Sequence, residues 1–416
     1  MSNLKKSYLT VFTLVLSASI ALSTHPTLAL DNSAQTASNT SSVTTAAGST
    51  STGTTSASTG AASTDASSAD SSASSTTKPA TPPDTSTLNL SLDDALKTVE
   101  TGNPDLKLAD SQIAIYDKQN QTDLAQHSAG TAVTDEDSKK VAFLNYKRSQ
   151  WTLDNAKHDR DTQLKNLKVD VTNQYETILA LQQQVNNYAT ELQNIDKVID
   201  QVNLQIKLGL QIPSAIDSYT ASKSKLQAAQ KAVQNTINSD MITLKQDLGI
   251  DLSRNVVLTS SLIPYTQFDD SKFNDQIAEA IKNDYNIQKY TQDIDITQVE
   301  HDIDLEFDDK AADQLEISIE DKKETLANLG INKEVALRTE YNSMKSLENT
   351  IAADKLTVEA DQINLNTKQK NVDVGTATSL DMINLQNTLL NDQNTLQQDI
   401  NSYMTAAANL QNDLAD

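Results

Sequence analysis

Two long stretches without glycine or proline constrain this chain more than any other feature. Neither residue occurs from Asp137 to Leu208, nor from Ile331 to Val374. Because both residues break helices, stretches of this length predict continuous helices. At about 1.5 Å per residue, about 70 helical residues would span roughly 105 Å. Helices of that length are stable only when they pack in coiled coils or bundles.

The apolar residues of the first stretch recur in steps of three and four. They are Val171, Tyr175, Ile178, Leu181, Val185, Tyr188, Leu192, Ile195, Ile199, Val202 and Ile206. This spacing is typical of a coiled-coil seam with one skip. A similar row of leucines near the C-terminus is interrupted by Asp392. Thin seams of this kind explain a hydrophobic content of only 37% without invoking disorder.

The chain also repeats itself. The first copy of the pattern is Val171, Tyr175, Ile178, Leu181, Val185 and Gly209, and the second is Leu337, Tyr341, Met344, Leu347, Ile351 and Gly375. Every member of the second copy lies 166 residues after its counterpart, whereas upstream matches such as Leu106 and Ile287 lie 181 apart. Each repeat predicts a helix, a connector, a long helix, a glycine turn and a final helix. We place the repeats at 88–252 and 253–416.

The N-terminal part differs from the repeats. Residues 1–29 contain Lys5, Lys6, an apolar run and a small-residue site, which together predict a signal peptide; the alternative is an uncleaved anchor. Residues 30–87 form the predicted linker, and 41 of the 55 residues from 32 to 86 are Ser, Thr or Ala. Such a segment buries too little apolar area to fold. We therefore expect an exported protein of the cell envelope with a disordered, low-complexity tether.

Composition excludes several classes of protein. A formal net charge of −23 argues against nucleic-acid binding, which needs a basic surface. The absence of cysteine excludes disulfides and thiolate metal sites. Aromatic residues make up only 4% of the chain, whereas transmembrane β-barrels carry aromatic girdles. The excess acids either line a lumen, where they would favour cationic solutes, or keep the surface soluble.

Several short motifs resemble the TolC-type outer-membrane efflux protein family. Helix starts of the family match Ser91–Leu96 followed by Asn103-Pro104-Asp105-Leu106. Its glycine turns match Leu208-Gly209-Leu210 and Val374–Asp381, and Leu248–Asp251 fits the junction between its repeats. Each motif is weak alone, but their order and the duplication cover residues 88–416.

The resemblance implies a homotrimer whose twelve helices surround a hollow duct. It implies a periplasmic-adaptor-type protein and an inner-membrane pump as partners. The adaptor-facing helix tips would contain Leu208, Gly209, Leu210, Val374, Gly375 and Thr376. Asp381 falls where members often place an acidic gate, although Asn384 stands where a second acid is expected and Ala377 where a base can occur.

The connectors near 126–140 and 304–322 depart from the family pattern. Members form a membrane barrel from hairpins there, with strands of about 9–11 residues. The first connector is short and polar, and the second has only two short alternating pieces, 302–307 and 314–319. We interpret both as ends of helical hairpins, with a vestigial strand hairpin in the second as an alternative. The expected fold is therefore all-α, with long antiparallel coiled-coil hairpins in a duplicated TolC-like protomer and without a full transmembrane β-barrel.

Catalytic interpretations find little support. His127, His158 and His301 are isolated in polar sequence, and no paired carboxylates, phosphate loop or nucleophile motif occurs. The acidic run 302–309 lacks the spacing of a calcium loop, so we expect a solvated acidic face. Trp151 and Phe143 are expected to pack a helix seam. We expect no enzyme, cofactor or metal, and hold two functions open: an efflux or secretion duct, or a non-transporting structural or adhesive spacer.

Overall fold

A computed structural model describes residues 86–130, 132–307 and 309–415 of the chain. The predicted signal peptide at 1–29 lies outside these residues. So does the predicted linker at 30–87, apart from Ser86 and Thr87.

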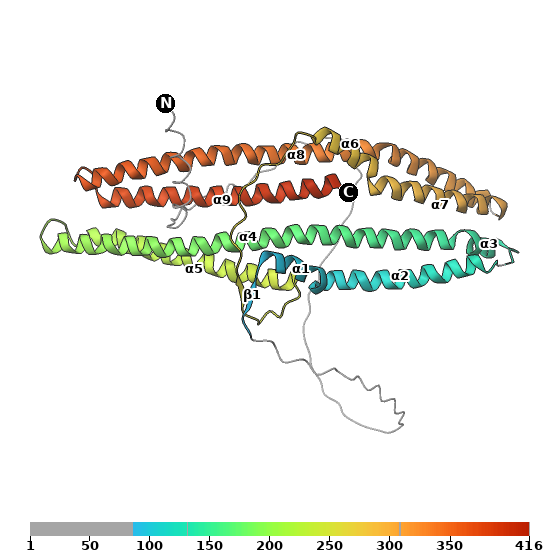
Figure 1. Cartoon of the computed structure of the whole chain (residues 1–416), viewed down its shortest axis with the longest axis horizontal. Coiled ribbons are helices and arrows are strands. Elements are labelled where there is room, and N and C mark those ends of the chain that lie inside the picture. Colours follow the sequence, from blue (N-terminus) through green and yellow to red (C-terminus); the bar gives the residue numbers. More distant parts are fainter. Residues whose placement is uncertain (1–85, 131, 308, 416) are drawn as a thin grey trace, which may run out of the picture. The chain divides into compact units, whose positions relative to one another are not determined.

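The described part is almost entirely helical and consists of two series of elements (Figure 1). The first series is β1 (Leu88–Leu90), α1 (Leu92–Gly102), α2 (Pro104–Ser128), α3 (Glu136–Phe143), α4 (Asn145–Lys207) and α5 (Ala215–Asp247). The second series is β2 (Val256–Leu258), α6 (Phe273–Asn283), α7 (Tyr285–Phe307), α8 (Asp309–Asp373) and α9 (Ser379–Ala415). Both series have the same order of elements. The single long helix α8 of the second series corresponds to α3 and α4 of the first. The prediction of a duplicated all-α fold is confirmed.

The short helices begin at residues that satisfy free backbone N–H groups. The Ser91 hydroxyl accepts a hydrogen bond from the Asp94 N–H (3.1 Å) at the start of α1. The Asn103 side chain caps α2 by accepting from the N–H groups of Asp105 and Leu106, at 2.9 and 3.0 Å. Asp284 does the same for α7, accepting from the Ile287 N–H (3.1 Å). A cap of this kind stabilises a helix by roughly 1 kcal/mol.

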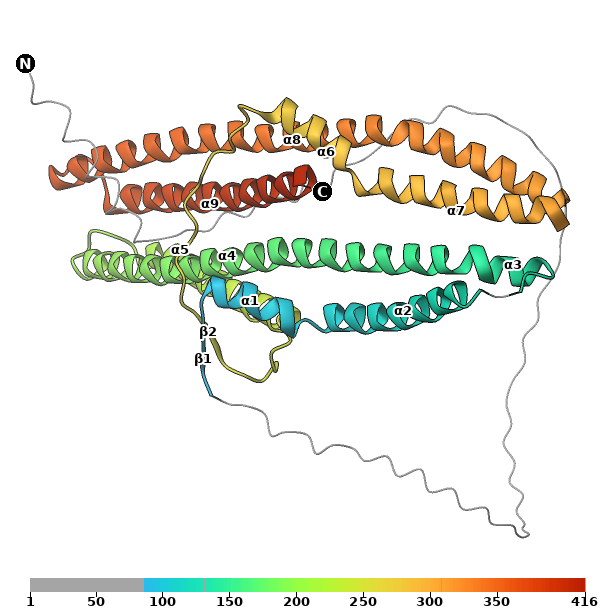
Figure 2. The same ribbon diagram turned by 45° about the vertical axis from the view of Figure 1, so that its right-hand side comes forward.

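The long helices α4 and α8 carry the architecture. α4 packs along α2 and α5 on one side and along α9 and α7 on the other, and α8 packs on α7 and α9. Both views show the same lateral order: α2 and α5, then α4, then α9 and α7, then α8 (Figures 1 and 2). The described part therefore has two different edges, one formed by α2 and α5 and the other by α8.

The core of the first repeat closes around Tyr175 on α4. β1 and β2 form a parallel pair in which Leu88 lies opposite Val256. The fully buried Tyr175 hydroxyl donates to the Leu90 carbonyl (2.8 Å) and accepts from the N–H groups of Thr259 and Ser260 (both 3.0 Å). One side chain thus fixes both strands to the long helix, and so joins the start of the first repeat to the start of the second.

The second connector forms the end of a helical hairpin, as interpreted from the sequence, and the alternative of a vestigial strand hairpin is wrong. Residues 302–307 and 314–319 are helical parts of α7 and α8, not a strand hairpin. Burial there follows the helical period: Ala312 and Ile319, seven residues apart, are buried, whereas Ile317 is exposed. The helix α8 begins well before the glycine-free stretch that starts at Ile331, so Gly330 lies within it.

The aromatic prediction is half right. Trp151 is half-buried, and its Nε1–H donates to the Lys289 carbonyl of α7 (3.2 Å). Phe143 does not pack a seam, because it is the last residue of α3 and its side chain is exposed.

Candidate functional site: the hairpin tips

The turns between α4 and α5 and between α8 and α9 have the same hydrogen bonds. In the first, the Gly209 N–H donates to the Ile206 carbonyl (3.0 Å) and the Leu210 N–H to the Gln205 carbonyl (2.8 Å). In the second, Gly375 bonds to Val372 (3.0 Å) and Thr376 to Asn371 (2.8 Å) in the same way. This is the Schellman motif, which ends a helix through a residue with positive φ. Gly209 and Gly375 both have φ +74°.

The tips expose large apolar side chains. Leu208, Leu210, Ile212 and Val374 are 63% to 72% exposed. Three of these four were predicted as tip residues. Ile212 was not among the predicted tip residues, although its position directly before Pro213, in the same turn as Leu208 and Leu210, was a usable signal. Exposed apolar residues gathered in one turn make the tips a candidate surface for binding another molecule.

Packing holds the two tips on the same side of the described part. Ile383, near the start of α9, packs with Val198 and Val202 near the end of α4. The Asn194 side chain of α4 also donates to Gln386 of α9 (3.2 Å). The structure therefore brings the predicted residues of the two repeats toward one end, where the turns follow α4 and α8 (Figure 2).

Asp381 has a local role at this end. Its Oδ2 accepts from the Thr378 N–H, and its own N–H donates to the Thr378 hydroxyl, both at 3.2 Å. Hydrogen bonding to Thr378 lowers the pKa of this exposed carboxyl, which therefore stays ionised at neutral pH. The reciprocal pair is a capping box at the start of α9. The role of Asp381 as an acidic gate stays a prediction.

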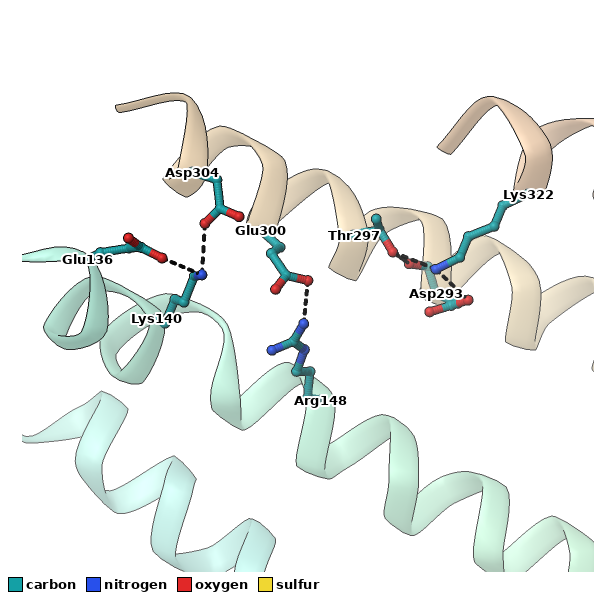
Figure 3. A network of polar contacts seen from close by, with 8 residues as sticks. All are labelled: Glu136, Lys140, Arg148, Asp293, Thr297, Glu300, Asp304 and Lys322. Atoms are coloured by element: carbon teal, nitrogen blue, oxygen red, sulfur yellow. Dashed lines mark hydrogen bonds and ion pairs between the residues drawn. The ribbon is translucent and has the colours of Figure 1, made fainter. Parts of the chain in front are cut away.

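The opposite end is held by ion pairs between the repeats, which the sequence analysis did not foresee (Figure 3). Lys140 of α3 binds Asp304 of α7 (2.8 Å) and Glu136 (2.6 Å), and hydrogen bonding to Asp304, then to Glu136, raises its pKa. Arg148 of α4 pairs with Glu300 of α7. The expectation of a solvated acidic face is therefore wrong for Asp304, which is buried against a lysine.

A second set of contacts continues this network from α7 to α8. Lys322 of α8 binds Asp293 (2.8 Å) and the Thr297 hydroxyl (2.7 Å), both on α7 (Figure 3). Lys139 of α3 also pairs with Glu306 of α7. Partly buried pairs of this type fix the register of neighbouring helices, although their net contribution to stability is modest.

A polar cavity of about 640 Å³ lies where α4, α7, α8 and α9 meet. His158 stacks on Tyr285 across this junction, with ring centroids 3.6 Å apart, and Lys333 reaches Asp284 (3.5 Å). These contacts are those of a helix junction. Within the described ranges, no three His, Cys, Asp or Glu side chains are placed to hold a metal ion.

Comparison with known proteins identifies the fold. No family model matches the sequence, and no curated protein does. A membrane protein from Pseudomonas aeruginosa is similar at a TM-score of 0.62 and 9% identity, over 78% of this chain and 92% of that chain. CusC, described with transmembrane channel formation, is similar at 0.58 and 13%, over 78% and 91%. The outer membrane protein VceC from Vibrio cholerae is similar at 0.56 and 13%, over 78% and 94%.

At these identities the similarity establishes the fold alone. The described part of the chain has the fold of TolC-like helical channel proteins. None of the helices in this part has the length and hydropathy of a membrane span.

Proposed function

We propose that this chain is one subunit of a TolC-like efflux or secretion duct in the cell envelope. In this proposal the protein is exported through residues 1–29, tethered by residues 30–87 and built from the repeats 88–252 and 253–416. It acts as a homotrimer that passes small solutes or an exported protein. A periplasmic-adaptor-type protein docks on the tips and links the duct to an inner-membrane pump. The resemblance to the TolC-type efflux family and the shared fold support this proposal.

The observation that carries the proposal is an unpaired apolar seam on each edge. On the α2 edge, Leu108 and Ile115 are exposed and seven residues apart. On the α8 edge, Val335, Leu356 and Ile363 are exposed at spacings of 21 and 7. A spacing of seven residues is typical of a coiled-coil contact, so another helix can pack on each edge.

Both exposed seams face away from the packed side of their helix. Leu108 follows the buried Leu106 by two residues, and Val335 precedes the buried Leu337 by two. Two residues correspond to a rotation of about 200° around a helix. Because the two edges differ, one subunit's α8 would lie along the next subunit's α2 and α5, with Leu356 and Ile363 toward α5 at the tip end. Head-to-tail contacts of this kind form a closed ring when the rotation between neighbouring subunits closes.

Charge substitutions on each edge test this arrangement. Leu108→Glu with Ile115→Glu, or Leu356→Glu with Ile363→Glu, should each convert the oligomer to monomers in sedimentation velocity. Thr350→Glu with Thr357→Glu is the matched control, because both residues are exposed on α8 and lie about 100° around the helix from the seam. A wild-type full-length chain that stays monomeric at high concentration would contradict the duct.

Mixing the two edge variants sharpens the test. Each variant keeps one intact edge, so a mixture should form heterodimers through the intact α2 edge of one and the intact α8 edge of the other. It should form no larger ring. If the mixture stays monomeric although the wild type assembles, the contact does not join these two edges.

The tips are tested separately. Leu210→Glu with Val374→Glu keeps both turn glycines and replaces two exposed apolar residues. We expect cells carrying this variant to retain a fluorescent cationic dye that the wild-type chain helps to export, while the ring still forms. Unchanged dye export with an intact ring would contradict the tip assignment. If deletion of the wild-type gene leaves dye accumulation unchanged, the alternative of a structural or adhesive spacer is favoured.

A further inference from the structure

The α8–α9 hairpin contains three carboxyl pairs across its seam. They are Glu340 with Asp413, Asp354 with Asp399, and Asp361 with Asp392, and the two carboxyl groups of each pair interact across the seam. The members of every pair are equally distant from the turn at Thr376 and Ala377. All three pairs therefore share one antiparallel register, with steps of 14 and 7 residues along each helix.

In each pair one carboxyl oxygen on α8 has no donor. Glu340 Oε2, Asp354 Oδ2 and Asp361 Oδ2 are buried and have no hydrogen-bond partner. Two ionised carboxylates have only acceptors, so a bond between them requires a proton on one of them. Burial, followed by the charge of Asp413, raises the pKa of Glu340 to about 7. Burial, followed by the hydrogen bond to the α8 partner, raises the pKa of Asp392 and of Asp399 to about 6.

The lysines near these pairs also interact with other groups. The charge of Lys333 lowers the pKa of Glu340, and Lys333 also pairs with Asp284 (3.5 Å). Lys345 pairs with Glu348 (2.8 Å) and Asp270 (3.3 Å). Lys355 lies 4.0 Å from the centre of the Tyr265 ring.

The other elements packed here add mostly acids. The titratable groups that line the cavity beside Asp413 are His158, Asp159, Asp170, Asp284, Tyr285, Lys289 and Lys333. Those of α6 are Asp275, Glu279 and Lys282, of which Glu279 and Lys282 pair with each other (3.2 Å). From α4, Glu191 faces Asn387 of α9, and burial raises its pKa to about 9.

The α4–α5 hairpin has the same register but different chemistry. The residues 166 positions before the three pairs are Gln174 with Asp247, Tyr188 with Val233, and Ile195 with Leu226. Gln174 donates a hydrogen bond to Asp247 (2.7 Å), and the other four side chains form one hydrophobic cluster. The fold therefore accommodates a seam without facing acids at these positions, and only the second hairpin pairs two acids there.

We propose that the carboxyl pairs make α8–α9 a proton-dependent clasp that holds the two helices together in mild acid and loosens near the tip as the pH rises. In mild acid each pair holds one shared proton. At higher pH each pair holds two negative charges in a partly buried seam, which repel each other. If the proposed duct exists, this clasp adjusts its adaptor-facing end to the pH outside the cytoplasm.

The pH window follows from the sign of the shifts. The folded state holds protons more tightly than the unfolded chain, whose carboxyl pKa values are about 4. The stabilisation is therefore complete below pH 4 and is lost as the pH rises through about 6 to 7.

Distances between spin labels test the clasp. The chain has no cysteine, so paired cysteine substitutions label it uniquely. Gln369→Cys with Asn384→Cys reports the tip side of α8–α9, and both sites are exposed. Asn203→Cys with Ser218→Cys, 166 positions earlier, reports α4–α5 as a matched control. Measured in EDTA on the full chain, the first distance distribution should be narrow at pH 5 and longer and broader at pH 8. The control distribution should be the same at both pH values.

An amide variant separates proton sharing from general effects of pH. In Asp354→Asn with Asp361→Asn, each amide can donate to the partner carboxylate at any pH. The α8–α9 distribution should then stay narrow at pH 8. The proposal is overturned if the wild-type distribution does not change with pH, or if the amide variant broadens as the wild type does. The distance is read within one chain, so a monomeric protein would refute the duct and still report on the clasp.

Discussion

The two long hairpins share a backbone plan and differ in the chemistry of their seams. Both end in the same Schellman turn, and both pair their helices in one register. Where α4–α5 buries Tyr188, Ile195 and Leu226, α8–α9 places Asp354, Asp361 and Asp392. Register is thus maintained by the turn and by the apolar residues further along the helices. The central seam positions are free to carry a different property in each repeat.

The largest expected effect comes from moving acids into the first hairpin. Ile195→Asp with Leu226→Asp would place two carboxyls in a hydrophobic cluster. The loss of apolar burial and the cost of burying charge should lower the free energy of unfolding by about 3–5 kcal/mol at pH 8, and by less at pH 5. Urea denaturation at both pH values measures this difference. Gln193→Asp with Thr220→Asp, at exposed sites of the same helices, should change little.

A smaller difference is expected between two tyrosines at equivalent positions. Tyr175→Phe removes a buried hydroxyl that serves three backbone groups and should cost about 2–3 kcal/mol. Tyr341→Phe removes an exposed hydrogen bond to Asp270 (2.8 Å) and should cost about 0.5 kcal/mol. Equal losses in thermal denaturation would show that the strand link is not fixed by Tyr175.

The reverse exchange should strengthen the second hairpin. Asp361→Ile with Asp392→Leu gives α8–α9 the residues of α4–α5 at the same register. We expect about 1–2 kcal/mol of added stability at pH 8, because half-buried acids become aliphatic side chains. The stability curve should also depend less on pH between 4 and 7. A destabilised variant would mean that the two seams are not equivalent in geometry.

The smallest expected effect is the same in both repeats. Gly209→Ala and Gly375→Ala each place a Cβ at φ +74°, where nothing else lies within 4 Å of it. Each should cost about 1 kcal/mol, from the backbone conformation alone. Thermal denaturation of the two variants compares the tips directly, and a cost at only one of them would indicate that the turns differ in solution.

Much of this fold was predictable from the sequence. Breaker-free stretches, the step of three and four, and the offset of 166 residues located α4, α5, α8 and α9. The segments 302–307 and 314–319 left a strand hairpin open as an alternative, because a short alternation of apolar residues is compatible with either a strand or an exposed helix face. Asp392 was visible as a gap in a leucine row. Its partner Asp361 could have been found by reflecting the sequence about the Gly375 turn.

Contacts between segments far apart in the sequence could not be predicted from these patterns. Lys140 and Asp304 are 164 residues apart, and nothing local to either residue indicates the other. Their pairing depends on how α3 and α7 meet, which the heptad pattern of each helix leaves open. The candidate site shows the same difference. The tip turns depend on local sequence and were predicted. The edges that would join subunits became visible only from the packing of the long helices.

Electron cryomicroscopy of the purified full-length chain tests the proposed duct most directly. We expect a closed ring in which α8 of each subunit lies against α2 and α5 of the next, with all tips at one end and a continuous central opening. Isolated subunits, or a two-fold dimer in which α8 meets α8, would contradict it.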